Sequence, residues 1–128
     1  MADEKLLMMS MAVTEMGSAK AFYAEQLGWS VTKDAGQGER HWVNLELPGG
    51  GALLMLTTMH QHMKPGTMKF YLSTSNIQAM YDELKAKGVK LNEVENDLYG
   101  PGSGVKWFEL HDPDGNQLVV AQSERGPR

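Results

Sequence analysis

Apolar and polar positions form a series of elements that occurs twice along the chain. A short apolar strand, a helix and three further strands are predicted between Lys5 and Thr58, and again between Thr67 and Gln122. A repeat of this length cannot bury its own apolar face, so each copy has to pack against the other. We therefore predict one α+β domain of two βαβββ modules. Its parts are module one (5–58), a linker (59–66), module two (67–122) and a polar, frayed tail (123–128).

In module one, a helix is predicted from apolar residues that recur at helical spacing. Ser18 is placed to cap its N-terminus, and Gly28 stands where a helix end needs a left-handed residue. Gly36 and Gly38 predict a turn between strands. The face of the helix consists of Ala19, Phe22, Tyr23 and Leu27, and the strands are expected at 6–13, 29–33, 41–47 and 52–57.

Module two repeats this order, with Asn76 as the helix cap and Gly88 after the last turn. A loop rich in Gly and Pro, Tyr99–Gly104, precedes the last two strands and is interpreted as a movable lid or as an ordinary connection. The apolar face of the helix consists of Ile77, Met80, Tyr81 and Leu84, and the strands are expected at 68–73, 89–95, 105–110 and 117–122.

The segment Asp112–Gly115 fits a type I turn, because Asp bonds back to the backbone, Pro presets the second position and Gly suits the fourth. A calcium-binding loop would place glycine sixth and a carboxylate twelfth. Here glycine is fourth and position 123 is serine, so the calcium interpretation fails.

Composition narrows the classes of partner. The net charge of −4 and a pI near 5.5 leave no basic stripe, so we expect no nucleic-acid partner. The absence of cysteine excludes disulfides, thiolate metal sites and a cysteine nucleophile, and fits a reducing compartment. The apolar run 6–13 is too short to cross a bilayer and follows Asp3 and Glu4 instead of a basic segment. We expect a soluble, cytoplasmic protein without a membrane partner.

The segments Ser18–Gly28, Ile77–Gly88 and His111–Asn116 carry a resemblance to the vicinal oxygen chelate superfamily. That superfamily holds glyoxalase I, extradiol dioxygenases, fosfomycin-modifying enzymes and bleomycin-binding resistance proteins. The resemblance covers nearly the whole chain. It implies a curved mixed sheet with a concave cup and helices on the convex side, and it implies a homodimer, in some members with modules exchanged between subunits. Activity does not follow from the fold.

Metal-dependent members of the superfamily hold an ion on the first and fourth strands of each module. The resemblance places these four positions at Met8, Met55, Lys69 and Val119. Thioether sulfur is a soft donor, an ammonium has no lone pair and valine has no donor atom, so we expect no metal and no cofactor. A one-residue shift of register would bury Lys69 under a helix, which is costly. The core-facing residues are then Met9, Met11, Val13, Met68, Phe70, Leu72, Leu118 and Val120.

The same alternation predicts a cup wall with flat rings for stacking and a few polar groups. Lys69 and Glu109 are expected either to form a buried ion pair or to bind a polar group of a ligand. The three rings are alternatively ordinary packing residues, and the methionines fill volume. The predicted wall consists of Met8, Ser10, Trp42, Asn44, Leu53, Met55, Thr57, Lys69, Tyr71, Trp107, Glu109 and Val119.

Four histidines are assigned smaller roles. His60 and His62 form a His-x-His pair, but two ligands in a loop make no metal site, so both are expected in solvent. His41 should lie on the face opposite Trp42. His111 is expected either to reach the mouth of the cup or to cap its strand.

These features favour a metal-free protein that binds a small molecule, similar to the antibiotic-sequestering branch of the superfamily, with a compact, partly planar, aromatic ligand. The alternative is a small lyase, isomerase or transferase that uses Glu109 as acid or base, or an unrecognised metal site of the glyoxalase type. Burial would raise the pKa of Glu109 and Lys69 would lower it, so the direction is open. A structural alternative is a non-catalytic dimer whose cup is filled by its own side chains.

Overall fold

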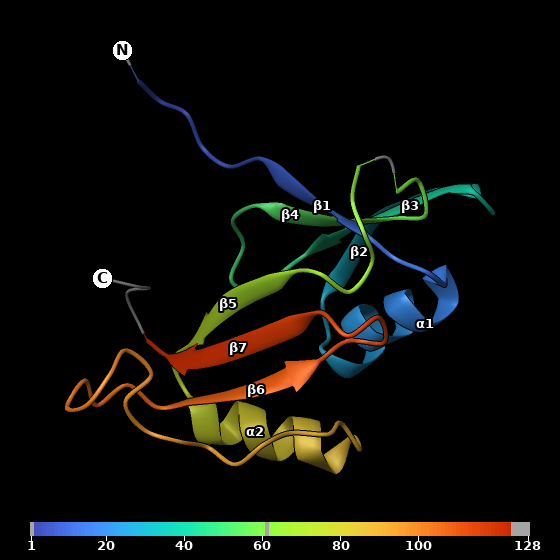
Figure 1. The fold of residues 1–128 in the computed structure, drawn as a ribbon. Helices are drawn as coiled ribbons and strands as arrows, with labels where there is room; N and C mark the ends of the chain where they lie inside the picture. The colour runs from blue at the N-terminus through green and yellow to red at the C-terminus, as the bar shows by residue number, and fades with distance from the viewer. Residues whose placement is uncertain (1, 61, 124–128) are drawn as a thin grey trace. The chain divides into compact units, whose positions relative to one another are not determined.

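The computed structural model describes residues 2–60 and 62–123 (Figure 1). They fall into two compact units. The first comprises the residues up to Thr67 together with Pro113–Gly115, and the second comprises Met68–Asp112 together with the residues from Asn116 onwards. The first unit contains a four-stranded sheet, sheet A, and the second a three-stranded sheet, sheet B. The α+β class expected from the sequence is confirmed.

In each unit the first and last strands pair in parallel, and the remaining pairs are antiparallel. Sheet A has the order β1-β4-β3-β2, and sheet B has the order β5-β7-β6. The elements of the first unit are β1 (Met8–Ala12), α1 (Met16–Lys20), the π-helical segment η1 (Ala21–Gln26), β2 (Ser30–Gln37), β3 (Arg40–Glu46) and β4 (Leu53–Thr57). Those of the second are β5 (Lys69–Thr74), α2 (Ile77–Ala86), β6 (Trp107–His111) and β7 (Gln117–Gln122).

The prediction of a strand at 89–95 was wrong. Only Glu95 forms a bridge, to Trp107, so sheet B has three strands where the repeat predicts four. The amide of Glu109, which a fourth strand would bond through its backbone, instead donates to the side-chain oxygen of Asn92 at 2.5 Å. Asparagine and charged residues in this segment favour such local side-chain bonds over a regular ladder.

The start of the first helix also differs from expectation. Glu15, and not Ser18, is the N-cap, and its carboxylate accepts a hydrogen bond from the Ser18 amide at 2.5 Å. Glu15 has an extended backbone (φ −131°), so the chain turns into the helix three residues earlier than predicted. This hydrogen bond lowers the pKa of the Glu15 carboxyl. The end is as predicted, with Gly28 at φ +77°.

The predicted turn at Gly36 and Gly38 is shorter than expected. Gly36 lies inside β2, which extends to Gln37 and not only to Lys33. A Cβ on Gly36 would lie 1.8 Å from the Arg40 carbonyl oxygen, so only glycine fits this close strand approach. In module two, Asn76 caps α2 by accepting from the Ala79 amide, and β7 has the predicted bounds.

The core of each unit lies between its sheet and its helix, and every second strand residue points into it. In sheet A, Phe22 and Tyr23 of η1 and Trp29 pack as an aromatic cluster with ring centroids 5.0 and 5.1 Å apart. In sheet B, the Tyr81 ring of α2 meets Phe108 edge-on at 5.3 Å. The strand residues at most 7 % exposed on these faces are Met11, Val43, Leu45, Leu54, Leu56, Phe108, Leu110, Leu118 and Val120.

This pattern tests the predicted strand phase. Val13, like Met11, Leu118 and Val120, is buried as predicted. Phe70 and Leu72 of β5 are half-buried, whereas Lys69 and Tyr71, which alternate with them along the strand, are exposed. Met9 is the exception, with 39 % of its surface exposed, because β1 is an edge strand.

A buried Asp–Asn pair closes the turn between β6 and β7. The Asp112 carboxylate accepts from the backbone and side-chain amides of Asn116, both at 2.8 Å, as the turn prediction required for Asp. The Asn116 side-chain oxygen accepts from the Met68 amide at 2.9 Å, just before β5. Asp112 is 6 % and Asn116 0 % exposed, so the pair fixes three strands from within the core. Ser123 donates its amide to Thr74, and the rest of the predicted frayed tail lies outside the described residues.

We predict that Asn116→Ala lowers the free energy of unfolding by about 2–4 kcal/mol, because it removes the side-chain amide that donates to the buried Asp112 carboxylate and the side-chain oxygen that accepts from the Met68 amide. Urea denaturation measures this loss. The matched control is Asn96→Ala at an exposed position, which should change stability by less than about 0.5 kcal/mol. Equal effects of the two substitutions would contradict the role given to the pair.

Candidate functional site

We call the face of each sheet opposite its buried, helix-covered face the helix-free face. On sheet A, strand pairing places Met55 between Ser10 of β1 and Asn44 of β3 on this face. Trp42 lies one pair further along, opposite Thr57. The Lys33 ammonium stands over the Trp42 ring, 5.3 Å from its centroid. Sequence alternation thus predicted which residues share this face.

Two polar groups on this face differ in their bonding. Thr57 is 2 % exposed, and its hydroxyl accepts the Met59 amide at 2.9 Å, so it has little left to offer a ligand. The side-chain oxygen of Asn44 is buried and has no hydrogen-bond partner among the described residues. A buried acceptor without a donor is costly, and a ligand with an N–H or O–H group would satisfy it.

On sheet B, the helix-free face combines an exposed ring with a polar pair. Tyr71 is 57 % exposed, and the Lys69 ammonium lies 5.4 Å from its ring centroid. Val119 lies between Tyr71 and Glu109 and is 2 % exposed. Trp107, two residues before Glu109 on β6, is half-buried.

Glu109 is bonded to a neighbouring strand residue. Its carboxylate accepts a hydrogen bond from the Gln117 side-chain amide. Among the described residues no ion pair joins it to Lys69, so of the two roles that the sequence left open for these residues the ion pair is not formed. The Gln117 side chain intervenes because β7 lies between β5 and β6 and places Gln117 directly beside Lys69.

The four positions at which the resemblance places metal ligands do not present a donor set for a hard divalent ion. Met8 and Met55 lie on the helix-free face of sheet A, and Lys69 and Val119 on that of sheet B. They supply two thioethers, one ammonium and one alkyl group. Within 2–60 and 62–123, no group of three or more His, Cys, Asp or Glu side chains is arranged to hold a metal ion.

The histidines are placed differently from one another. His60 was expected in solvent, which was wrong: it is half-buried, and its Nε2 donates to the Val13 carbonyl at 2.8 Å. His62 is exposed, as predicted. His41 points away from Trp42 and lies 2.6 Å from the Asp34 carboxylate. His111 is exposed at the end of β6.

Asp34 joins three elements of the first unit. One of its oxygens accepts from the Lys20 ammonium of α1 at 2.7 Å, and the other lies beside the His41 ring of β3. The hydrogen bond from Lys20, and then that from His41, lowers the pKa of the Asp34 carboxyl below its ordinary value. The folded state therefore favours the ionised carboxylate.

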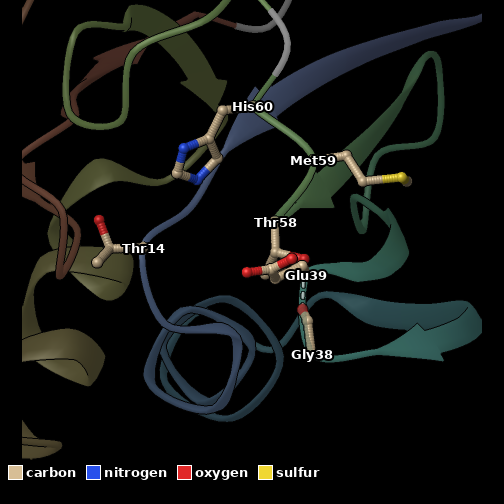
Figure 2. Close-up of a pocket in the computed structure, with 6 residues that line it drawn as sticks. All are labelled: Thr14, Gly38, Glu39, Thr58, Met59 and His60. Atoms are coloured by element: carbon tan, nitrogen blue, oxygen red, sulfur yellow. Dashed lines mark hydrogen bonds between the residues drawn. The ribbon is translucent and has the colours of Figure 1, made fainter.

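A hollow of about 630 Å³ opens at one end of sheet A (Figure 2). It lies where the parallel strands β1 and β4 end and where the β2–β3 turn comes near them. Sequence reasoning did not connect these residues, although residues that follow the carboxyl ends of parallel strands are a known location of sites. The hollow is lined by Thr14, Gly38, Glu39, Thr58, Met59 and His60.

The glycine-rich loop expected to be a lid or a connection is closed at its base. The Asp97 carboxylate accepts from the Gly104 amide at 2.8 Å, and Leu98 donates its amide to Val105. Asp97 takes a left-handed backbone (φ +62°) to do so. The side chain of Tyr99 in this loop is 56 % exposed.

Comparison with known proteins gives a family match and several similar structures. A family model described as Glyoxalase/Bleomycin resistance protein/Dioxygenase superfamily matches residues 5–120. TnmS3, an antibiotic binding protein from Streptomyces sp. CB03234, is 26% identical with a TM-score of 0.77, over 94% of this chain and 96% of that one. A glyoxalase/bleomycin resistance protein from the same strain is 26% identical with a TM-score of 0.75, over 93% and 100%.

More distant similarity shows the fold alone. Lactoylglutathione lyase from Agrobacterium tumefaciens is 14% identical with a TM-score of 0.75, over 94% of each chain. A search of curated proteins gave no match. In the described part of the chain, no helix has the length and apolar character needed to cross a membrane.

We predict that Asp34→Asn destabilises the protein at neutral pH and does so progressively less as the solution is acidified. A lowered folded-state pKa contributes stability above the ordinary carboxyl pKa, and that contribution is lost as the pH falls through the lowered value. Urea denaturation at pH 7 and pH 3 measures the gap, which is the difference in free energy of unfolding between variant and parent. Asp3→Asn, at an exposed position, serves as the control and should show a small gap at both values. A gap for Asp34→Asn that widens on acidification would contradict the predicted direction of the pH dependence.

Proposed function

Because the chain belongs to the glyoxalase/bleomycin resistance protein/dioxygenase superfamily, we propose that it binds a small molecule without a metal ion. The observation that carries the proposal is the donor chemistry at Met8, Met55, Lys69 and Val119, which gives a hard divalent ion no oxygen or imidazole ligand. The fold is retained, and the chemistry of the metal-dependent members has no support from these four side chains.

The helix-free faces favour a compact, partly planar ligand. Each face presents a ring with a lysine ammonium above it: Trp42 with Lys33, and Tyr71 with Lys69. A ligand ring that takes the place of the ammonium gains stacking contact with the aromatic side chain. The displaced ammonium can then pair with an oxygen at the edge of the ligand ring. We propose that the ligand is aromatic and carries a carboxylate, a phenolate or a similar acidic group.

The two helix-free faces differ in the polar groups that each offers to a ligand. The Asn44 side-chain oxygen lacks a donor, so a ligand N–H or O–H group placed there relieves a buried unsatisfied acceptor. The Glu109 carboxylate is already held by Gln117, which leaves Lys69 as the group of that face available to an acidic ligand. On the helix-free face of sheet B, Trp107 adds a second ring to that of Tyr71.

The relatives support the ligand class. TnmS3 is described as an antibiotic binding protein and is 26% identical to this chain. We propose that this protein also binds an antibiotic, that the antibiotic is planar and aromatic, and that the protein sequesters it as a homodimer in the cytoplasm. Thr57 and Val119, at 2 % exposure, contribute to the shape of the surface more than to direct contact with the ligand.

Anthraquinone-2-carboxylate and its neutral counterpart 2-(hydroxymethyl)anthraquinone test the proposal as a matched pair. We expect saturable quenching of tryptophan emission and a higher Tm with the carboxylate. Lys69→Met should weaken binding of the carboxylate about tenfold and leave the affinity for the neutral compound unchanged. Only the carboxylate gains a charge-assisted contact with the lysine. Trp42→Phe and Trp107→Phe should reduce the quenching, whereas Trp29→Phe, in the core at 5 % exposure, should not alter the Kd.

Three outcomes would overturn the proposal. One is the absence of saturable quenching and of any Tm shift with this pair and with a panel of planar aromatic antibiotics. Another is a stoichiometric divalent ion in protein purified without chelators. The third is chemical conversion of the bound compound seen by mass spectrometry, which would favour an enzyme over a binding protein.

A further inference from the structure

We infer that the hollow at the end of sheet A is a second binding site, selective for a small organic cation that carries an ammonium group on a short apolar body. None of its lining residues is one of the predicted ligand-contacting residues of the helix-free faces. Its lining comes from three separate segments of the first unit, which Figure 2 shows together: Thr14, Gly38 with Glu39, and Thr58 to His60.

Hydrogen bonds hold the upper wall of the hollow in place. The His60 ring is fixed by its bond to the Val13 carbonyl at 2.8 Å. The Thr58 hydroxyl donates to the Gly38 carbonyl at 2.7 Å and accepts from the His41 amide at 3.0 Å. The Met59 amide donates to Thr57. A ligand therefore meets a preformed wall and does not have to order it on binding.

The opposite wall is held by a carboxylate of the same unit. The amide of Thr14 donates to both oxygens of Asp114 at 3.2 Å. Asp114 in turn lies close to Gly66, where a Cβ would be only 2.3 Å from the Asp114 carbonyl oxygen. Thr14 thus lines the hollow with its backbone amide engaged.

The lining offers more hydrogen-bond acceptors than hydrogen-bond donors. Because the Nε2 of His60 donates to Val13, the neutral ring keeps Nδ1 as an acceptor. The Thr58 hydroxyl proton is engaged with the Gly38 carbonyl. The Thr14 hydroxyl can accept as well as donate. A ligand complementary to this set must bring its own N–H donors.

The charge of the lining selects a cation. Glu39 is its one carboxylate, and among the described residues it takes part in no ion pair. Glu39 and His60 are two potential metal ligands, fewer than a metal site needs, so an organic ammonium suits the lining better than a divalent ion. The Met59 thioether supplies a polarisable apolar contact for the body of the ligand.

The site and the helix-free faces are opposite in charge. Lysines stand over the rings of the helix-free faces, whereas a carboxylate borders the hollow. An acidic aromatic compound and an ammonium compound should therefore bind at separate places. This contrast makes the inference testable independently of the proposed function.

Phenethylammonium and its charge-reversed isostere 3-phenylpropionate are the probes, and ¹³C-methyl methionine NMR of the full chain is the readout. The Met59 methyl signal is assigned by its loss in Met59→Leu. We expect a saturable shift of the Met59 methyl and of the His60 ring protons with phenethylammonium and none with 3-phenylpropionate. Glu39→Gln, in an exposed turn, should weaken binding at least about fivefold, as expected for loss of a charge-assisted contact.

The matched control is Glu46→Gln, an exposed glutamate at the far end of β3, which should leave the affinity unchanged. Equal responses to the two probes, or a Glu39→Gln affinity equal to that of the parent, would overturn the inference. So would phenethylammonium that quenches tryptophan emission without moving the Met59 signal, since it would then bind a helix-free face. Failure of anthraquinone-2-carboxylate to bind would affect only the proposed function.

Discussion

The buried pairing of Asp112 with Asn116 sets the register on which the second unit depends. Two hydrogen bonds at 2.8 Å close the β6–β7 turn, and a third from Asn116 holds the amide just before β5. Strand side chains alternate with a period of two, so a slip of one residue would exchange the buried and helix-free faces. The pair therefore decides that Phe108 and Leu118 are buried and that Tyr71 is presented to solvent.

That alternation also connects the fold to its chemistry. The resemblance places the metal ligands of the superfamily at four strand positions on the helix-free faces, which in this chain carry Met8, Met55, Lys69 and Val119. None of these substitutions disturbs the core, because each points away from it. A fold can therefore be kept while its donor set is lost, and the surface that remains is one of rings, ammonium groups and an unsatisfied amide oxygen.

Sequence reasoning succeeded where a local rule decides the structure. Asn76 caps α2, Gly28 ends the first helical segment and β7 has its expected bounds, because capping, left-handed glycine and strict alternation act over a few residues. It failed at 89–95, where the Asn92 side chain takes the amide that a neighbouring strand would bond. It also failed for His60, whose partner is the Val13 carbonyl, 47 residues away. The hollow escaped prediction for the same reason, since tertiary bonds from distant segments assemble it.

The turn Pro113–Gly115 is part of the first compact unit, although the strands on either side of it are part of the second. The Asp114 carboxylate of this turn accepts a hydrogen bond from the Thr14 amide, and the Asp114 backbone lies against Gly66. The two halves of the repeat are thus not interchangeable building blocks: a polypeptide cut in the linker would leave the amino-terminal piece without the carboxylate that completes it.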